Sequence, residues 1–264
     1  MMKESCKSVY ICQSYDEKSS VLFLRHGVVQ LGRNILTPAY MYIESSLMIL
    51  IAEQLLKSSQ CPRIVRVYGE MQERMDFQLP RDVLQPSKRT QMTSERLRNI
   101  SLHYLIRKTG KRYSGKILEF DALFDENRET PESVKDVQLQ EYRKLILKAS
   151  IEELKNYDVV LCTCSGSSSR WIVRGTNIAQ IIIDECGMCM EPEALVPLVT
   201  FSSTEQVVLI GDHKQLQPIV INRHAKNLGL NVSLFERYAE EKALMLGLQY
   251  RMVCRPTCSP VAVH

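Results

Sequence analysis

Three short, almost wholly apolar runs in the second half of this chain constrain its fold more than any other feature. They are Asp158–Thr163, Ile178–Ile183 and Glu205–Ile210, and Pro192 marks the predicted start of a helix between the last two. Strands that are apolar along their length are typical of a parallel sheet covered on both faces by helices, because neither face meets water. The sequence therefore predicts an α/β fold.

Two of these strands end in polar motifs. Asp184-Glu185 follows the second strand, and Gly211-Asp212, with Gln215 close behind, follows the third. Ligands of open α/β sheets gather at the carboxyl ends of strands. For phosphoryl transfer, Asp184 could hold Mg²⁺, Glu185 could orient a water molecule and Gln215 could contact a terminal phosphate. The alternative is a pair of surface acids followed by an ordinary Gly-Asp turn.

A third motif, Gln249-Tyr250-Arg251, lies near the end of the chain. Arg251 could stabilise charge that develops on a transferring phosphoryl group, and Tyr250 could stack on a nucleotide base. The alternative is the polar end of a strand.

Charge is distributed in blocks. From Pro86 to Lys116 there are nine lysines and arginines against one acid, and from Ile117 to Asp136 there are seven acids against two bases. Residues 80–116 are predicted to be basic helices, 119–136 a loop, and 138–155 an amphipathic helix. The basic block predicts a surface that faces a polyanion, with a solvated helical face as the alternative.

The nine cysteines form an odd set in a chain that begins without an apolar leader. The longest apolar stretch, Leu47–Ala52, is too short to cross a bilayer. We therefore expect no membrane association and a reducing intracellular compartment, the cytoplasm first and the nucleus as the alternative. Cys186-x-x-Cys189 has the spacing of a structural zinc ligand pair, so a zinc protein is a third hypothesis.

The segment from Asp158 to Met252 strongly resembles the Upf-like group of superfamily 1 RNA helicases. The amino-acid sequence from Ile183 to Glu193 is similar to that of the Mov10 and helicase-with-zinc-finger branch of that group. Arg66 to Glu70 resembles an upstream element of the family, so the resemblance extends over residues 43–252. It implies a RecA-like parallel sheet of the P-loop NTPase type with a helical basic insertion.

The resemblance also implies ATP and Mg²⁺ as cofactors and single-stranded RNA as a partner, with protein partners an open alternative. Asp184 and Glu185 would form the Walker B pair, for Mg²⁺ and for water activation. Gln215 would sense the γ-phosphate, Tyr250 would stack on adenine, and Arg251 would contact the γ-phosphate.

On the RNA side, the resemblance implies that Thr163 and Ser165 lie near the RNA backbone. The basic insertion would reinforce this contact through Lys108, Lys111 and Arg112.

The chain departs from the family at both ends. The glycine-rich phosphate loop is absent, because Gly27 and Gly32 are the only glycines before residue 60 and neither precedes a Lys-Ser/Thr pair. Residues 42–56 have helical spacing, and after Met252 the family pattern stops. The domain is thus expected to be incomplete at both ends, to lack its first strand and to expose a strand edge.

These expectations divide the chain into five parts. The predicted parts are an atypical N-terminal segment (1–42), a partial first RecA-like domain (43–79 and 156–222), a helical insertion (80–155), a connection into a second RecA-like domain (223–252) and an atypical tail (253–264). The predicted function is that of a partial RNA helicase with negligible ATPase activity. The alternative is a non-catalytic module that binds RNA or protein.

Overall fold

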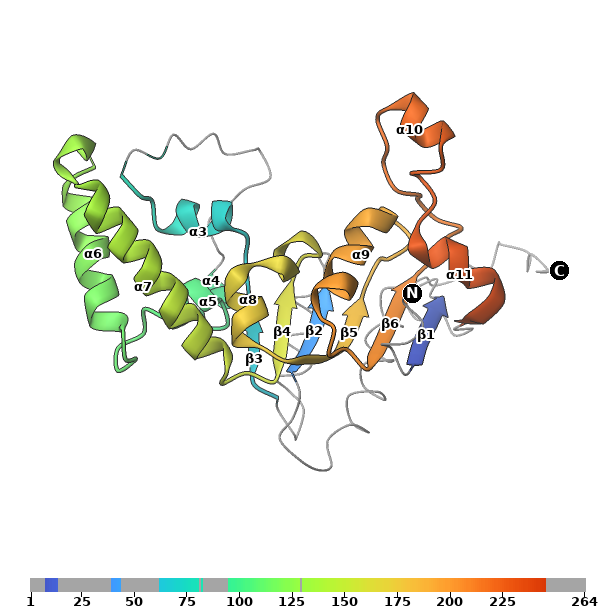
Figure 1. Cartoon of the computed structure of the whole chain (residues 1–264), viewed down its shortest axis with the longest axis horizontal. Coiled ribbons are helices and arrows are strands. Elements are labelled where there is room, and N and C mark those ends of the chain that lie inside the picture. Colours follow the sequence, from blue (N-terminus) through green and yellow to red (C-terminus); the bar gives the residue numbers. More distant parts are fainter. Residues whose placement is uncertain are drawn as a thin grey trace, which may run out of the picture.

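The computed structural model describes residues 8–13, 39–43, 62–80, 82, 95–128 and 130–245. Their centre is a seven-stranded sheet in which every pairing is parallel, in the order β3-β4-β2-β5-β6-β1-β7 (Figure 1). The strands are β1 (Ser8–Gln13), β2 (Ala39–Ile43), β3 (Ile64–Arg66), β4 (Val159–Cys162), β5 (Ile178–Ile183), β6 (Gln206–Gly211) and β7 (Ala243–Met245). This is a parallel α/β sheet, as the sequence predicts.

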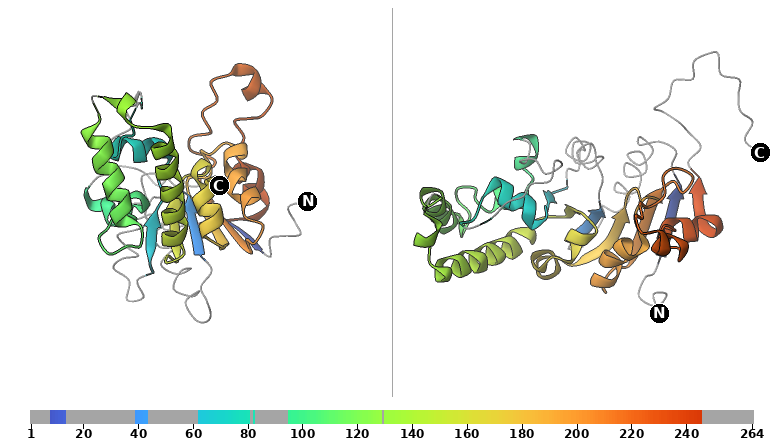
Figure 2. Two further views of the ribbon diagram at one scale, coloured as in Figure 1. Left: turned by 60° about the vertical axis from the view of Figure 1, so that its left-hand side comes forward. Right: turned by 90° about the horizontal axis from the view of Figure 1, so that it is seen from above.

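The three apolar runs form strands as predicted. β4 is buried along its whole length, and β5 and β6 each have only one residue that is not buried. Helices α8 (Arg170–Gly175), α9 (Glu191–Thr200) and α11 (Leu234–Lys242) lie along one face of the sheet (Figure 2). The predicted helix near Pro192 is α9, and the short α10 (Arg223–Asn227) projects away from the sheet between β6 and α11.

The N-terminal part of the chain differs from the prediction. The sheet was expected to lack its first strand, but β1 pairs with β6 on one side and β7 on the other. β2 is also inside the sheet, between β4 and β5. Tyr42 and Ile43, predicted to begin a helix, are the last residues of β2, and residues 44–56 lie outside the described residues. Strand partners far away in the sequence decide the structure of these short runs.

Helical segments connect β3 to β4, and all of them except the first lie within residues 80–155, where the insertion was predicted. They are α3 (Glu70–Asp76), α4 (Glu95–Arg98), α5 (Leu102–Leu105), α6 (Ser114–Glu126), the 3₁₀ turn η1 (Pro131–Ser133) and α7 (Asp136–Leu154). The amphipathic helix predicted at 138–155 is confirmed as α7, whereas the loop predicted at 119–136 is wrong for residues 119–126, which belong to α6. Ile117, Phe120 and Phe124 are buried at helical spacing, so their packing makes α6 a helix despite its acidic residues.

The C-terminal described residues return to the same sheet. The sequence assigned residues 223–252 to a connection into a second domain, but β7 pairs with β1 in register from Ile11↔Ala243 to Gln13↔Met245. α11 precedes β7 directly and packs against β1. Residues up to Met245 are therefore part of the first sheet. Among the described residues, no helix is both long and apolar enough to span a membrane.

Candidate functional site

The first candidate site is the turn after β5. Asp184 directly follows the last residue of β5, and its side chain is 5% exposed. Glu185 is the one non-glycine residue with positive φ in the described part of the chain, at 52°. A left-handed conformation is unfavourable for a residue with a β-carbon, and such outliers cluster at functional sites. The turn thus holds two adjacent carboxylates in different settings, one buried and one half-exposed.

Backbone contacts join this turn to the loop after β6. The amide of Cys186 donates to the carbonyl of Ile210 at 2.8 Å, and the amide of Met188 donates to the carbonyl of Glu185 at 2.9 Å. A β-carbon at Gly187 would lie 2.7 Å from the carbonyl oxygen of Asp212, so glycine is needed for this approach. The two loops are packed backbone against backbone.

The loop after β6 holds Gln215 through Asp212. The Asp212 carboxylate is 5% exposed, and it accepts hydrogen bonds from the Lys214 amide and from Gln215 Nε2, both at 2.9 Å. Gln215 itself is exposed. The structure therefore brings Asp184, Glu185 and Gln215 to one edge of the sheet. Asp212 is a positioning residue; from the sequence it was named within the motif and given no role, although the Asp-x-x-Gln spacing could have indicated one.

The strand that ends beside this edge is β1. Gln13, its last residue, is in register with Gly211 of β6, so the chain leaves β1 next to the Asp212 loop. A phosphate loop in a P-loop NTPase leaves such a strand. Here the residues that follow are Ser-Tyr-Asp-Glu-Lys-Ser, with Lys18-Ser19 but no glycine. They lie outside the described residues, as do Tyr250 and Arg251.

Thr163 and Ser165 lie in the loop after β4, at the start of the 3₁₀ turn η2 (Ser165–Ser168). Both are exposed, their hydroxyl oxygens are 3.3 Å apart, and Thr163 Oγ1 also accepts a hydrogen bond from the Gly166 amide at 3.1 Å. The loop thus presents two hydroxyl groups from a turn that is fixed by its own hydrogen bonds.

This loop lines a cleft of about 670 Å³ between α3, α7 and α8. Arg143 of α7 and Arg170 of α8 also line the cleft, and neither forms an ion pair with another described residue. Trp171 contributes an indole Nε1–H group that has no acceptor in the described part of the chain. Glu70 and Glu73 line it too, but they face Arg74 and Arg107 at 2.6 Å and 3.7 Å. The exposed guanidinium groups of Arg143 and Arg170 therefore line the same cleft as Thr163 and Ser165, whereas the indole N–H of Trp171 is buried.

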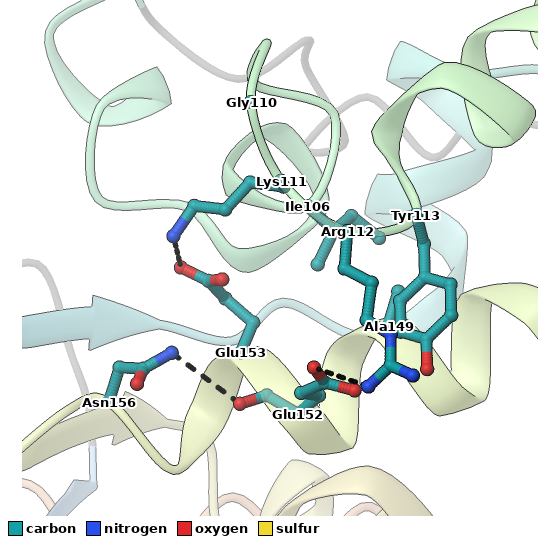
Figure 3. A pocket seen from close by; sticks show the side chains of 9 residues that line it. All are labelled: Ile106, Gly110, Lys111, Arg112, Tyr113, Ala149, Glu152, Glu153 and Asn156. Atoms are coloured by element: carbon teal, nitrogen blue, oxygen red, sulfur yellow. Dashed lines mark hydrogen bonds and ion pairs between the residues drawn. The ribbon is translucent and has the colours of Figure 1, made fainter.

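The predicted basic surface on the insertion is largely paired with acids. Lys111 Nζ is 2.8 Å from Glu153, and Arg112 is 3.5 Å from Glu152, both on α7 around a pocket of about 160 Å³ (Figure 3). Lys108 is exposed and has no ion-pair partner among the described residues. Two of the three predicted RNA contacts thus form ion pairs between α7 and the loop that joins α5 to α6.

Arg107, from the same block, is buried rather than exposed. Its guanidinium donates to Asp121 at 2.7 Å and to the hydroxyl of Tyr142 at 2.6 Å. Burial raises the pKa of Tyr142, and Asp121 raises it further despite the nearby guanidinium, so this phenol stays protonated. Part of the positive charge counted in the sequence is therefore buried inside the insertion and does not contribute to its surface. Among the described residues, no three His, Cys, Asp or Glu side chains gather as a metal site.

Comparison with known proteins places this geometry in a family. A model described as an AAA domain matches residues 45–223. The 3'-5' exoribonuclease HELZ2 of Mus musculus is 42% identical over 193 residues, and that of Homo sapiens is 43% identical over 192 residues. Each alignment covers 71% of this chain and 6% of the relative. The ATP-dependent helicase NAM7 of Saccharomyces cerevisiae is 36% identical over 156 residues, which are 58% of this chain and 15% of the relative.

Proposed function

The chain belongs to the AAA domain family and is part of a Upf1-like superfamily 1 helicase, and from this premise we propose that it forms the RNA-binding and Mg²⁺-facing part of an ATP-driven RNA motor. The chain corresponds to a small share of its relatives' length, so unwinding is proposed for the whole protein and not for this segment. The observation that carries the proposal is the packing of the Asp184-Glu185 turn against the Asp212–Gln215 loop.

These residues suit the magnesium side of a bound nucleotide. Asp184 supplies a carboxylate at the end of a buried strand, which is the ligand type that Mg²⁺ prefers when it bridges phosphates. Mg²⁺ would neutralise the charge that develops on the phosphate oxygens. Glu185 would orient the attacking water, and Asp212, which accepts a hydrogen bond from Gln215, would hold Gln215 toward the terminal phosphate. Tyr250 and Arg251 would complete the site.

The segment that would bind the phosphates of the nucleotide fits that role less well than Asp184 and Glu185 fit theirs. A phosphate loop needs backbone amides that approach the oxygens closely, and glycines make this approach possible. The segment after β1 keeps Lys18-Ser19 and has no glycine. We therefore expect ATP hydrolysis to be negligible in this chain even though the carboxylate side is in place.

The direct test is steady-state ATPase activity of the purified chain, with and without single-stranded RNA. The matched control is Glu185→Gln, which removes the water-orienting carboxylate and keeps its size. We expect both proteins to be indistinguishable from buffer. Turnover that is clearly above the Glu185→Gln control would contradict the proposal that the phosphate side is deficient.

A non-catalytic RNA-binding module is the second candidate function, and the cleft beside Thr163 and Ser165 favours it. The guanidinium groups of Arg143 and Arg170 can pair with phosphates, and the hydroxyl groups of the loop can donate to phosphate oxygens. Such binding should be sensitive to salt and should survive Asp184→Ala, because the carboxylate edge takes no part in it. Loss of RNA binding in Asp184→Ala, with the fold intact by circular dichroism, would favour the motor over the module.

A further inference from the structure

Four cysteines meet where the loops after β4 and β5 lie side by side. Cys162 and Cys186 are fully buried, while Cys164 and Cys189 are partly buried against the core. The sulfur atoms of Cys164 and Cys189 are 3.9 Å apart, and both thiols are reduced. The sequence separates these two residues, and contact between η2 and α9 brings them together.

The two thiols occupy positions next to the candidate sites. Cys164 lies between Thr163 and Ser165, and Cys189 follows Glu185 by one turn and directly precedes the N-cap residue of α9, Met190. The Cys189 thiol also lies 3.8 Å from the Glu193 carboxylate. A bond between the sulfur atoms would therefore connect the two loops without passing through the sheet.

We propose that Cys164 and Cys189 form an oxidisable dithiol, and that a peroxide converts it to a disulfide that ties the two loops together. In the first step one sulfur attacks the peroxide, becomes a sulfenic acid and releases one water molecule. The second sulfur then displaces the hydroxyl group as a second water, and the S–S bond forms. Two electrons pass from the thiols to the peroxide, and both thiol protons leave in the water.

Geometry decides which pair reacts. The sulfur atoms must approach from 3.9 Å to a bond length of about 2.05 Å. Cys164 is on a short 3₁₀ turn and Cys189 is in the lead-in to a helix, so either segment can shift without breaking a strand. The hydrogen bond to Cys189, followed by burial, raises the pKa of Cys164. This thiol is therefore protonated at neutral pH, and we expect the pair to stay reduced in air and to need an added oxidant.

The disulfide would limit how the hydroxyl groups of Thr163 and Ser165 move relative to Glu185. Any effect on RNA binding rests on the proposed function, but formation of the disulfide does not. The two claims therefore fail separately: a chain that binds no RNA can still form the bond.

The test is peptide mapping of the full chain after treatment with hydrogen peroxide, quenched with an alkylating agent under denaturing conditions. Trypsin releases Asn156–Arg170, which contains Cys162 and Cys164, and Gly175–Lys214, which contains Cys186 and Cys189. We expect a disulfide-linked pair of these peptides that fragmentation assigns to Cys164 and Cys189 and that a reductant removes.

Two variants sharpen the assignment. Cys164→Ser and Cys189→Ser should each abolish the linked peptides, and unfolding profiles confirm that each variant is folded. Wild-type peptides that remain unlinked, or that are linked through Cys162 or Cys186, would overturn the proposal. The wild-type peptides alone show whether the Cys164–Cys189 disulfide forms, so the test remains valid even if a variant fails to fold.

Discussion

Gly211 of β6 faces Gly187 of the turn after β5 so closely that a β-carbon at Gly211 would lie 2.7 Å from the amide nitrogen of Gly187. This contact determines the distance between the Asp184-Glu185 turn and the Asp212–Gln215 loop. It is made by backbone atoms, which cannot move aside as a flexible side chain would.

Gly211→Ala should therefore lower the free energy of unfolding by about 1–3 kcal/mol, because overpacked sites must shift their backbone. Urea denaturation measures this change. The matched control is Gly115→Ala on the exposed side of α6, where a β-carbon meets nothing within 4 Å. This control should be neutral or slightly stabilising, because Gly115 lies in the first turn of α6, where the gain is smaller than the about 0.5–1 kcal/mol expected in the middle of a helix. Equal effects of the two substitutions would refute the packing argument.

Glu185→Gly should stabilise the chain by about 1 kcal/mol, because glycine adopts positive φ without a steric cost. Glu185→Ala loses the same carboxylate and keeps the β-carbon, so it should show no such gain. Thermal melts of the three proteins separate the two effects. A stabilised Glu185→Ala would mean that the carboxylate, and not the backbone conformation, is the source of strain.

Asp212 and Gln215 should be energetically coupled. Asp212→Asn replaces one of the accepting oxygens by an amide group, and Gln215→Ala removes the donor. A double-mutant cycle on unfolding free energy should give a coupling of about 1–2 kcal/mol, as expected for a hydrogen bond to a charged group. Additive effects would show that Asp212 does not hold Gln215 in solution.

RNA binding should depend on the cleft more than on the basic block. In Arg143→Ala/Arg170→Ala, loss of two phosphate contacts should reduce the slope of log affinity against log salt by about 1.4 for a single strand. The control is Lys111→Ala/Arg112→Ala, whose side chains pair with Glu153 and Glu152. Fluorescence anisotropy with labelled single-stranded RNA measures both slopes. A larger loss in the control would place the RNA site on the basic block instead of the cleft.

Cys186 should react slowly with iodoacetamide in the native chain. Burial, followed by the charges of Cys189 and Asp184, raises the pKa of this thiol. The reactive thiolate is thus scarce at pH 8.5, because its fraction falls tenfold for each unit by which the pKa exceeds the pH. In guanidinium chloride the residue should react like an ordinary cysteine. Mass spectrometry of Gly175–Lys214 follows the labelling, and equal rates in both conditions would contradict the prediction.

Sequence reasoning succeeded where a local pattern carried the information. β4 is wholly apolar, and β5 and β6 are apolar apart from Gln180 and Gln206, so burial on both faces could be expected from each run alone. The resemblance to the family after residue 155 then predicted that Asp184, Glu185 and Gln215 lie at one edge of the sheet. The role of Asp212 was missed because this residue orients a neighbour, which becomes visible only with coordinates.

The errors came from structure that depends on distant partners. β1 and β2 are short runs whose strand character follows from pairing with β4, β5, β6 and β7. The acidic residues of α6 suggested a solvated loop, but Phe120 and Phe124 pack in the core, where both rings meet Tyr142. Similarly, counts of Lys and Arg could not show that Lys111 and Arg112 face acids on α7.

The place of β1 in the sheet has a consequence for how the chain folds. Ser8 pairs with Gln206, so β1 leaves the ribosome almost two hundred residues before the strand that it pairs with. Such non-local pairings fold slowly and leave edges open meanwhile. A ribosome that pauses before β6 would hold an incomplete sheet, and chaperone binding at that stage should protect the nascent chain from aggregation.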